Sequence, residues 1–431
     1  MATRTATVCA GQTNDGPDDC GAFARSLADL KGYTIVTHGD PNPPATSADF
    51  NDCKNRTVAY WSGHGKESDD GEHYELQGTS WFKVGPIMSG WDTNDPLIAL
   101  FLASCNALST AHLRTKFADM MKRTRLFVIC GYRKTAPGSN NLDVTIVNNF
   151  FDHTNAGRGV ISAWKEAHGG TGREDNWGAL SYGGLAANYH FTLPGWEDNS
   201  GVSNYQQPIY YIYQDGSPLV WSPSANTSNA NELPYQVMVS ETPVSLNTHN
   251  LGDCTTIEKG ESITSLYRLQ KFEPVAASSL RKMANQCMVK IGAIPQMPGI
   301  ISTFSPVYRE EVLPTPSDAG DVIGGDMVYQ QSYNGIPLNQ SFLRICLDKD
   351  GVYNVTNKLC QINRHGAVMR SGAIMSVDDA KRMLPGYSAI AVKHSQYVYA
   401  DAGNGVYKLC HELTMADGLK YLVDTRTGEV M

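Results

Sequence analysis

Several sequence features that would assign a function class outright are missing from this chain. It has no Cys-x-x-Cys pair, which argues against a zinc ribbon or a thioredoxin-type site, and no His-Glu-x-x-His segment, which excludes a zincin active site. No glycine-rich loop follows a strand as in a phosphate cradle, because residues 169–172 end a predicted helix instead. We therefore expect no metal and no cofactor.

Long apolar runs and charge are also scarce. No run approaches the length of a membrane span, and the first eight residues lack the apolar core of a signal peptide. Charged residues make up only 18% of the chain, and the formal net charge of −8 comes without a basic stripe, which argues against nucleic acid as a main partner. Abundant Asn, Ser, Thr and Tyr fill the gap and favour an extracytoplasmic or secreted protein, although no signal peptide is present.

What is present divides the 431 residues into two domains. Residues 1 to about 190 alternate between strand and helix patterns, which predicts an α/β domain with a doubly wound, mostly parallel sheet. The pattern weakens after 190, although residues 208–213 could add an edge strand, and the stretch around 215–250 is linker-like. Residues 251–431 mix helices with hairpin material and predict an α+β domain, after a first domain of residues 1–250.

A histidine and a cysteine each end an apolar run in the first domain. The run 56–61 leads into Ser62-Gly63-His64-Gly65, and the run 96–102 leads into Ala103-Ser104-Cys105-Asn106. Runs of this kind predict buried parallel strands, whose carboxyl ends share one edge of the sheet. If the two strands are neighbours, the imidazole and the thiol open into one crevice, where a thiol can act as a nucleophile.

Two readings compete with this one. A lone cysteine is most often buried and inert, and Cys105 could be of that kind. His38-Gly39 also follows a strand-like run, so periodicity alone does not choose between His38 and His64. The glycines around His64 indicate that the backbone there approaches another group closely.

The order Ser-Gly-His-Gly, then Ala-Ser-Cys, resembles the caspase-like cysteine peptidases of clan CD, which include caspases, legumains, gingipains, clostripain and separases. Their shared pattern is an apolar strand ending in His-Gly, followed by one ending in Ala/Ser-Cys. Residues 117–124 resemble the helix after the nucleophile, residues 126–131 the next strand, and residues 159–164 a later helix of bacterial members. The resemblance covers about residues 30–190.

The resemblance implies a role for each matching residue. Cys105 would be the nucleophile, His64 the general acid/base, and the backbone N–H groups of Gly65 and Cys105 the oxyanion hole. The Arg-Gly that follows the cysteine in caspases is replaced by Asn106-Ala107, and legumain-like flanks are missing too. Specificity for aspartate or asparagine at the cleavage site is therefore not implied, and the substrate-binding residues are unknown.

Two neighbouring groups of residues have open interpretations. Glu67, Asp69, Asp70 and Glu72 form an acidic loop that is either a solvated turn or a site for a basic side chain or cation. Aromatic residues around the proposed crevice either line a substrate cleft or pack in the core and rim; these are Tyr60, Trp61, Tyr74, Trp81 and Trp91.

The second domain carries its own resemblance. Residues 325–337 and 343–351 resemble the propeptide of thermolysin- and fungalysin-type metallopeptidases, and residues 375–380 and 421–430 resemble the PepSY module. In those families a helix packs on a curved antiparallel sheet, and the module inhibits or chaperones a peptidase. In the closing Asp-x-x-Thr-Gly-Glu, Asp424 is expected to bond the turn backbone and Gly428 to adopt positive φ. An inert accessory domain is the alternative.

The sequence therefore predicts a cysteine-type endopeptidase that hydrolyses protein or peptide substrates through a thioester on Cys105, with His64 as general acid/base. Residues 251–431 would regulate it intramolecularly, and autoinhibition is one form that this regulation could take. The alternative is a non-catalytic caspase-like scaffold whose C-terminal module binds or inhibits a separate peptidase or a surface ligand. An acyl transferase on the same fold is a third, minor possibility.

Overall fold

The computed structural model describes most of the chain and divides it into two compact units. The described residues are 4–12, 18–39, 43–137, 142–169, 171, 173–182, 191–196, 208–215, 233–252, 254–259, 263–268, 270–293, 300–312, 321–368, 374–384, 386, 390–416 and 419–431. Unit 1 comprises residues 1–215, 271–274 and 306–323, and unit 2 comprises residues 216–270, 275–305 and 324–431. The boundary after residue 250 remains a prediction. Residues 216–232 of the expected linker lie outside the described residues. Residues 236–243 form strand β11, so that part of the stretch is not a linker.

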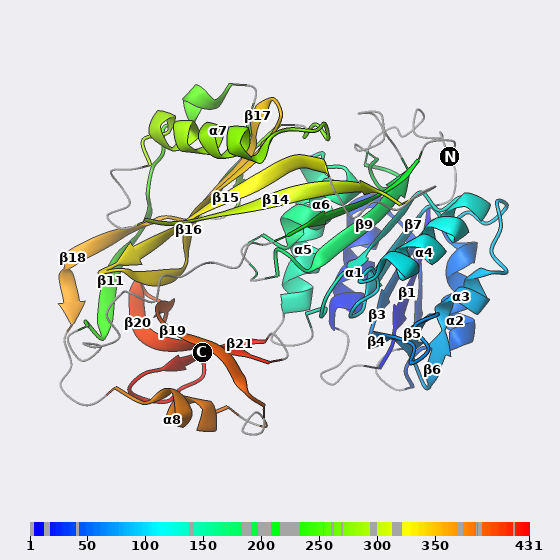
Figure 1. Cartoon of the computed structure of the whole chain (residues 1–431), viewed down its shortest axis with the longest axis horizontal. Helices are drawn as coiled ribbons and strands as arrows, with labels where there is room; N and C mark the ends of the chain where they lie inside the picture. Colours follow the sequence, from blue (N-terminus) through cyan, green and yellow to red (C-terminus); the bar gives the residue numbers. More distant parts are fainter. Residues whose placement is uncertain are drawn as a thin grey trace. The chain divides into compact units, whose positions relative to one another are not determined.

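A mixed, largely parallel sheet forms the centre of unit 1, as the prediction of an α/β class requires (Figure 1). Its strands run in the order β2-β1-β3-β7-β8-β9-β10-β14. The first five strands in this order are parallel to one another, whereas β9, β10 and β14 join by antiparallel pairing. The strand bounds are β1 Thr5–Ala10, β2 Thr34–His38, β3 Val58–Ser62, β7 Ala99–Ala103, β8 Val128–Tyr132, β9 Trp177–Tyr182, β10 Ile209–Gln214 and β14 Ile300–Glu311.

Helices cover both faces of this sheet. One group packs together on one face and consists of α1 (Asp18–Lys31), α5 (Leu142–Asn155) and α6 (Val160–Ala167). The other group consists of α2 (Ser47–Asp52), α3 (Val84–Met88) and α4 (Ala111–Arg123), and Figure 1 shows it on the opposite face. The doubly wound arrangement predicted from the alternating pattern is therefore present.

Two details of unit 1 differ from the sequence-based expectation. The glycine-rich stretch after His64 is a three-stranded antiparallel sheet of β4 (Gly65–Glu67), β5 (Tyr74–Gln77) and β6 (Trp81–Lys83). β10 is an interior strand, because it pairs with β9 on one side and with residues 307–311 of β14 on the other. That partner lies about a hundred residues further along the chain, so local sequence gave no sign of it.

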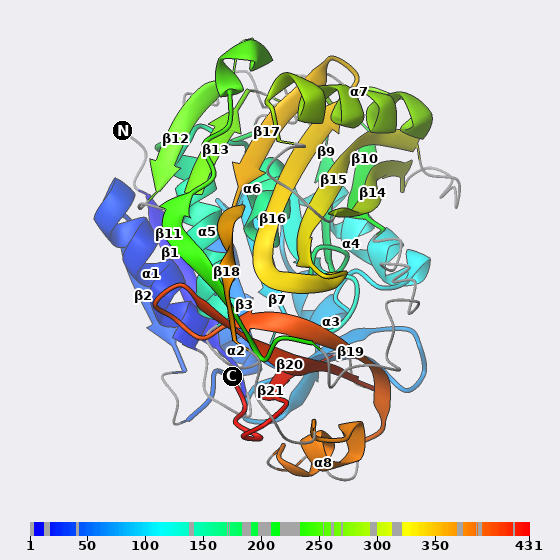
Figure 2. The same ribbon diagram turned by 90° about the vertical axis from the view of Figure 1, so that its left-hand side faces the viewer.

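In unit 2 the described strands form two mainly antiparallel groups, each with a helix, and a parallel pairing of Leu338 in β16 with Tyr399 in β19 joins the two groups. The first has the strand order β12-β13-β17-β16-β15, and α7 (Ala277–Lys290) packs on β16 and β17 (Figure 2). In the second, β20 pairs with β19, β21 and β11, β11 pairs with β18, and α8 (Val377–Arg382) packs on β20. The bounds are β11 Gln236–Pro243, β12 Thr255–Lys259, β13 Ile263–Tyr267, β15 Asp321–Tyr333, β16 Ile336–Asp348, β17 Gly351–Asn357, β18 Cys360–Val368, β19 Val392–Asp401, β20 Val406–Met415 and β21 Lys420–Asp424.

A buried aspartate organises the last turn of unit 2. The Asp424 carboxylate accepts hydrogen bonds from the N–H groups of Arg426 at 2.8 Å and Thr427 at 3.0 Å, and from the Tyr235 hydroxyl at 2.7 Å. Gly428 has φ of 71°, and residues 423 and 430 pair across the turn. The predicted strand–turn–strand is therefore confirmed. In the part of the chain that the structure describes, no helix has the length and apolar content to cross a membrane.

Asp19 provides a test of the packing beneath the sheet. Its carboxylate is 1% exposed and accepts a hydrogen bond from the Tyr60 hydroxyl at 2.6 Å. Burial raises the pKa of this carboxyl from 3.8 to about 6, against the lowering effect of the Tyr60 bond. A folded-state pKa above the unfolded value means that Asp19 contributes stability below about pH 4, and that this contribution is lost as the pH rises through about 6.

We therefore expect Asp19→Asn to gain stability relative to the unsubstituted chain as the pH rises from about 4 to 7. A shift of about two pKa units corresponds to about 3 kcal/mol in the free energy of unfolding. Urea unfolding at several pH values measures the difference directly, because the other carboxyls titrate alike in both proteins. If the free energy of unfolding changed with pH in the same way in both proteins, the pKa of Asp19 would not be raised in the folded state.

Candidate active site at the edge of the parallel sheet

The pairing of β3 with β7 brings the two predicted catalytic residues to the same edge. The strands are parallel neighbours in a register that pairs Ser62 with Ala103, and the Gly63 N–H donates to the Ala103 carbonyl at 3.4 Å. His64 and Cys105 are each the second residue beyond that pair, and both side chains are half-buried. The two strands are therefore neighbours, which is the condition that a shared crevice requires.

The loops that carry the two residues are in direct contact. A methyl group added at Gly65 would lie 2.8 Å from Ser104 Cβ and would clash with the Tyr74 hydroxyl, so a side chain does not fit here. The Gln77 N–H donates to the His64 carbonyl at 3.0 Å, which makes Gly65 and Leu76 a non-hydrogen-bonded pair of the β4–β5 ladder. The Gly65 N–H therefore points away from β5.

Hydrogen bonds hold the Cys105 loop on three sides. The Ala136 N–H donates to Cys105 Sγ at 3.3 Å, and the Tyr74 hydroxyl donates to the Cys105 carbonyl at 2.8 Å. The next residue, Asn106, has φ of 61° and donates its N–H to the Lys134 carbonyl at 2.9 Å. A left-handed residue directly after the cysteine turns the chain sharply at the end of β7. Cys105 thus lies on a fixed turn at the sheet edge.

Different groups around the Cys105 thiol shift its pKa in opposite directions. Burial raises the pKa of Cys105 above its ordinary value, whereas the Ala136 N–H and the positive charge of Arg173 lower it. Arg173 is 8% exposed, and among the described residues no carboxylate forms an ion pair with it. Burial has the largest effect of the three, so the pKa of the Cys105 thiol stays above its ordinary value.

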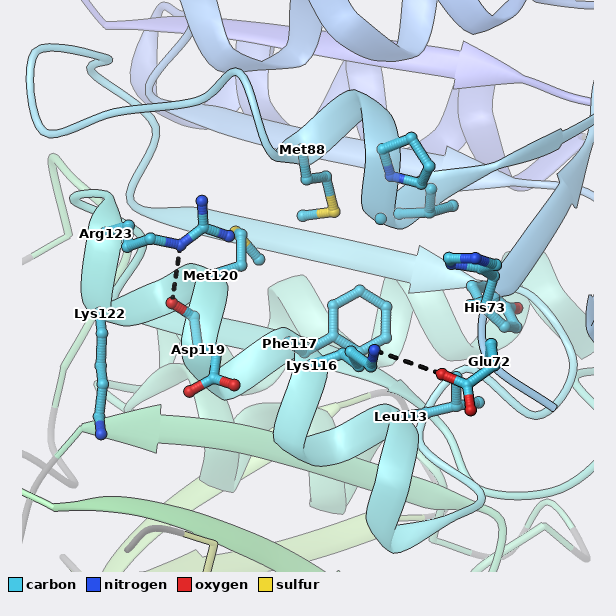
Figure 3. Close-up of a pocket in the computed structure, with 14 residues that line it drawn as sticks. Glu72, His73, Met88, Leu113, Lys116, Phe117, Asp119, Met120, Lys122 and Arg123 are labelled. Carbon is cyan, nitrogen blue, oxygen red and sulfur yellow. Dashed lines mark hydrogen bonds and ion pairs between the residues drawn. The ribbon is translucent and has the colours of Figure 1, made fainter.

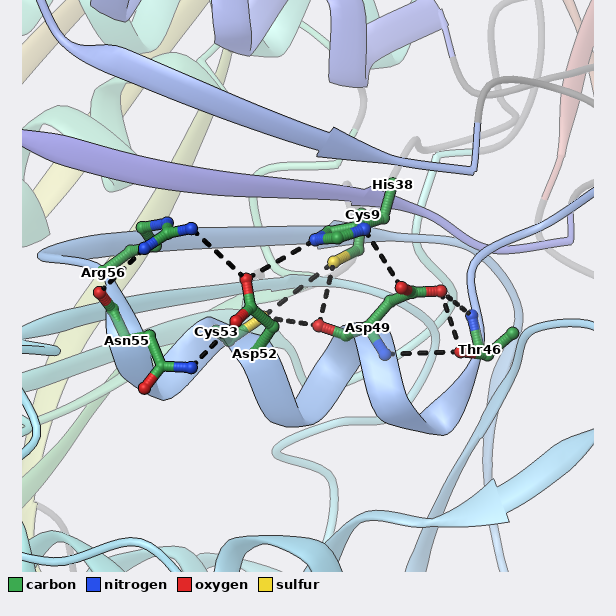
Figure 4. A network of polar contacts seen from close by, with 8 residues as sticks. All are labelled: Cys9, His38, Thr46, Asp49, Asp52, Cys53, Asn55 and Arg56. Carbon is green, nitrogen blue, oxygen red and sulfur yellow. Dashed lines mark hydrogen bonds and ion pairs between the residues drawn. The ribbon is translucent and has the colours of Figure 1, made fainter.

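The structure also separates His38 from the site. β2 lies on the far side of β1, and His38 packs against α2, where Nδ1 is 3.0 Å from Asp49 and Nε2 is 3.5 Å from Asp52 (Figure 4). This histidine is held between two carboxylates rather than beside Cys105. Of the two histidines that the sequence left open, His64 is therefore the one that follows a strand paired directly with the Cys105 strand.

In the acidic loop, three of the four carboxylates lie near lysines, and among the described residues no ion pair involves Glu67. Asp69 lies 3.7 Å from Lys66, Asp70 lies 3.2 Å from Lys83, and Glu72 lies 3.5 Å from Lys116. Hydrogen bonds from Ser68 and the Glu72 N–H hold the pKa of Asp70 well below its usual range. In the described ranges, no three His, Cys, Asp or Glu side chains form a group suited to a metal ion. The solvated-turn interpretation fits these contacts.

The aromatic residues near the site divide between core and surface. Tyr60, Trp61 and Trp91 are buried, and Trp61 packs edge-on against Phe50 at 5.6 Å. Trp81 is 41% exposed, with the Lys66 ammonium 5.0 Å above its ring. Most of this group therefore builds the core. The remaining member, Tyr74, is also buried, but its hydroxyl reaches the Cys105 loop.

Sequence reasoning missed two contributors to the site. The Ala136 N–H carries no side-chain signal, and Arg173 stands in a loop between α6 and β9 whose burial is not visible in the sequence. The alternation in Tyr74-Glu75-Leu76-Gln77 is the signal that could have identified β5. It would have shown that Tyr74 and Leu76 share one buried face.

Comparisons with known proteins found no matching family model and no matching curated protein. Among solved structures, the chain is similar to gingipain R, a cysteine proteinase, over 83% of this chain and 60% of that one, at 12% identity and TM-score 0.31. The Drosophila initiator caspase Dronc matches over 41% and 76% (13% identity, TM-score 0.25). The Bacillus megaterium YpeB C-terminal domain matches over 45% and 87% (10% identity, TM-score 0.25). All three likenesses are weak.

The charge of Arg173 gives a prediction for thiol reactivity. Arg173→Gln removes the positive charge that favours the thiolate, so the pKa of Cys105 rises further. We expect iodoacetamide to alkylate Cys105 at least about threefold more slowly in this variant than in the parent chain at pH 7.5. Peptide mass spectrometry over a pH series measures the rate at this cysteine alone.

Lys134→Gln is the matched control, because Lys134 is an exposed cation already paired with Asp175. It should leave the pH–rate profile unchanged. An equal effect of both substitutions, or none from Arg173→Gln, would show that Arg173 does not act on the thiol.

Proposed function

We propose that this chain is a cysteine endopeptidase in which Cys105 is the nucleophile and His64 the general acid/base. The observation that carries the proposal is the parallel Ser62–Ala103 pairing, which puts both residues two positions beyond the same rung of the sheet. Half-burial leaves each side chain accessible to a substrate. Reactive groups of open parallel sheets gather at this carboxyl edge.

The reaction would proceed in two steps. Cys105 Sγ attacks the scissile carbonyl carbon as its proton passes to His64, and His64 then protonates the leaving amine as the C–N bond breaks. Water hydrolyses the resulting thioester, which releases the carboxylic acid and restores the thiol. Because burial raises the pKa of the resting thiol, the proton leaves in the substrate complex rather than before binding.

Backbone N–H groups of Gly65 and Cys105 would stabilise the oxyanion of each step. The direction of the Gly65 N–H, away from the β5 ladder, supports this role. The Tyr74 hydroxyl bond to the Cys105 carbonyl fixes the peptide plane that follows the nucleophile. Donors that are fixed before the reaction cost no reorganisation when the negative charge develops.

For unit 2 we propose a propeptide- or PepSY-like role in modulating the peptidase. Its two helix-on-sheet halves, α7 on β16–β17 and α8 on β20, support this proposal. A caspase-like scaffold without catalysis is the second candidate. The partial burial of Cys105 is the observation that favours it, because burial disfavours the thiolate that a nucleophile needs. The two candidates differ in whether the thiol turns over a substrate.

Substitution of the proposed nucleophile tests the first candidate. We expect Cys105→Ala to abolish hydrolysis of a mixed fluorogenic peptide library, and His64→Ala to reduce it by about two orders of magnitude or more, as for loss of a general acid/base. Initial rates on the full chain are the measurement. Cys254→Ala and His38→Ala are matched controls, because Cys254 is also half-buried and His38 also ends a parallel strand of the same sheet, two strands away from β3.

Both controls should retain the parent rate. Full turnover by Cys105→Ala would overturn the assignment of the nucleophile. A parent chain that turns over no member of the library, and whose Cys105 alkylates no faster than Cys254, would favour the scaffold.

A buried residue of unit 2 tests modulation within the full chain. Asp424→Ala leaves two turn N–H groups and the Tyr235 hydroxyl without their acceptor, so we expect unit 2 to lose about 2 kcal/mol or more of stability. Peptidase rates at a temperature where only this variant has lost unit 2 should differ at least about twofold from those of the parent. The exposed Asp378→Ala is the control. An unchanged rate after unit 2 has unfolded would count against modulation.

A further inference from the structure

A cavity of about 670 Å³ lies within unit 1, between α4 on one side and α3 and β5 on the other (Figure 3). Its wall is mainly apolar and includes Tyr74, Val84, Met88, Leu113, Phe117 and Met120. The volume falls in the range, roughly 300–1,000 Å³, of small-molecule sites. Neither His64 nor Cys105 lines it, so it is separate from the proposed catalytic edge.

Charged side chains stand at its two ends and differ in how they are matched. At one end Lys116 lies 3.5 Å from Glu72, which balances its charge. At the other end Arg123 donates from Nε to the Asp119 backbone carbonyl at 3.3 Å, and among the described residues no carboxylate forms an ion pair with it (Figure 3). Arg123 is exposed at the mouth of the cavity. The cavity therefore has an apolar interior. Its rim at this end carries the Arg123 guanidinium, the Lys122 ammonium and the Asp119 carboxylate, so the charge there is positive on balance.

This combination selects for one class of small molecule. An alkyl chain would fill the interior, where the flexible thioethers of Met88 and Met120 adapt to its shape. A planar carboxylate at the end of that chain would meet the fork of the Arg123 guanidinium. We propose that this cavity binds an amphipathic carboxylate of the fatty-acid class, with its head group on Arg123, and that its occupancy acts on Cys105 through Tyr74.

Tyr74 forms the connection between the cavity and the catalytic edge. Its ring lines the cavity and meets Phe117 edge-on, with ring centroids 6.2 Å apart. Its hydroxyl donates to the Cys105 carbonyl at 2.8 Å and lies against the Gly65 backbone. A ligand that packs on the ring restricts the hydroxyl that holds both catalytic loops. By linkage, the state of the Cys105 loop affects the ligand in return.

Binding is tested with dodecanoate on the full chain, by calorimetry below its micelle concentration. We expect one saturable site, and weakening by about tenfold or more in Arg123→Gln and with the uncharged methyl ester. Met120→Trp should abolish binding by filling the interior. Arg125→Gln is the matched control, because Arg125 is an exposed cation two residues away that does not line the cavity.

Three outcomes would overturn the site. These are the absence of saturable binding, equal binding of the acid and its ester, and equal effects of Arg123→Gln and Arg125→Gln. The calorimetric binding measurement does not depend on peptidase activity, so Cys105→Ala should bind dodecanoate as the parent chain does. Binding without hydrolysis would sustain this site while rejecting the proposed function.

The connection is tested by the rate of Cys105 alkylation with and without saturating dodecanoate. We expect the ligand to change this rate by about threefold or more in the parent chain. In Tyr74→Phe the ligand should still bind, but the alkylation rate should no longer respond to it, because the hydroxyl bond is gone. A rate in the parent that does not respond to bound ligand would overturn the connection.

Discussion

The site depends on one constraint, the register between β3 and β7. A shift of a single residue would turn every side chain to the other face and move His64 and Cys105 to different levels of the sheet edge. Both strands are buried on both faces, so alternation of polar and apolar residues does not set this register. Aromatic packing sets it instead. On one face Phe23 contacts the rings of Tyr60 at 4.2 Å and Phe101 at 5.2 Å, and these two residues are paired across the strands.

The small β4–β6 sheet adds what the parallel sheet alone does not supply. It brings Tyr74 back across the ends of β3 and β7, where one hydroxyl touches both catalytic loops. The same side chain is a wall of the neighbouring cavity. A residue that is 2% exposed therefore links the floor of the site to an apolar space behind it. A larger residue in place of Gly65 would disturb both the catalytic edge and the cavity wall, because only glycine fits between Tyr74 and Ser104.

Sequence reasoning recovered the parts of the fold that local patterns encode. Apolar runs marked β3 and β7. The helices expected at 117–124 and 159–164 correspond to α4 and α6, although α4 begins six residues earlier, at Ala111. Strands β4 and β6 have three residues each, which is too few to show a period, so the sequence pattern does not identify them as strands. The charge of Arg173 was visible in the sequence, but its burial near the thiol depends on tertiary packing. The roles of His64 and Cys105 remain a prediction, because pairing strands fixes position and not chemistry.

The return of β14 to the first sheet has a consequence for how the two units can be separated. Residues 307–311 pair along β10, and Glu310, which is 5% exposed, lies 3.8 Å from Arg114 of α4. A chain cut after residue 250 would lack this strand. It would expose the β10 edge and leave Arg114 without its buried partner, and an unpaired strand edge promotes aggregation. Any change in activity after such a cut would report damage to unit 1. Substitutions within unit 2 of the intact chain are therefore the way to learn whether it acts on the Cys105 site.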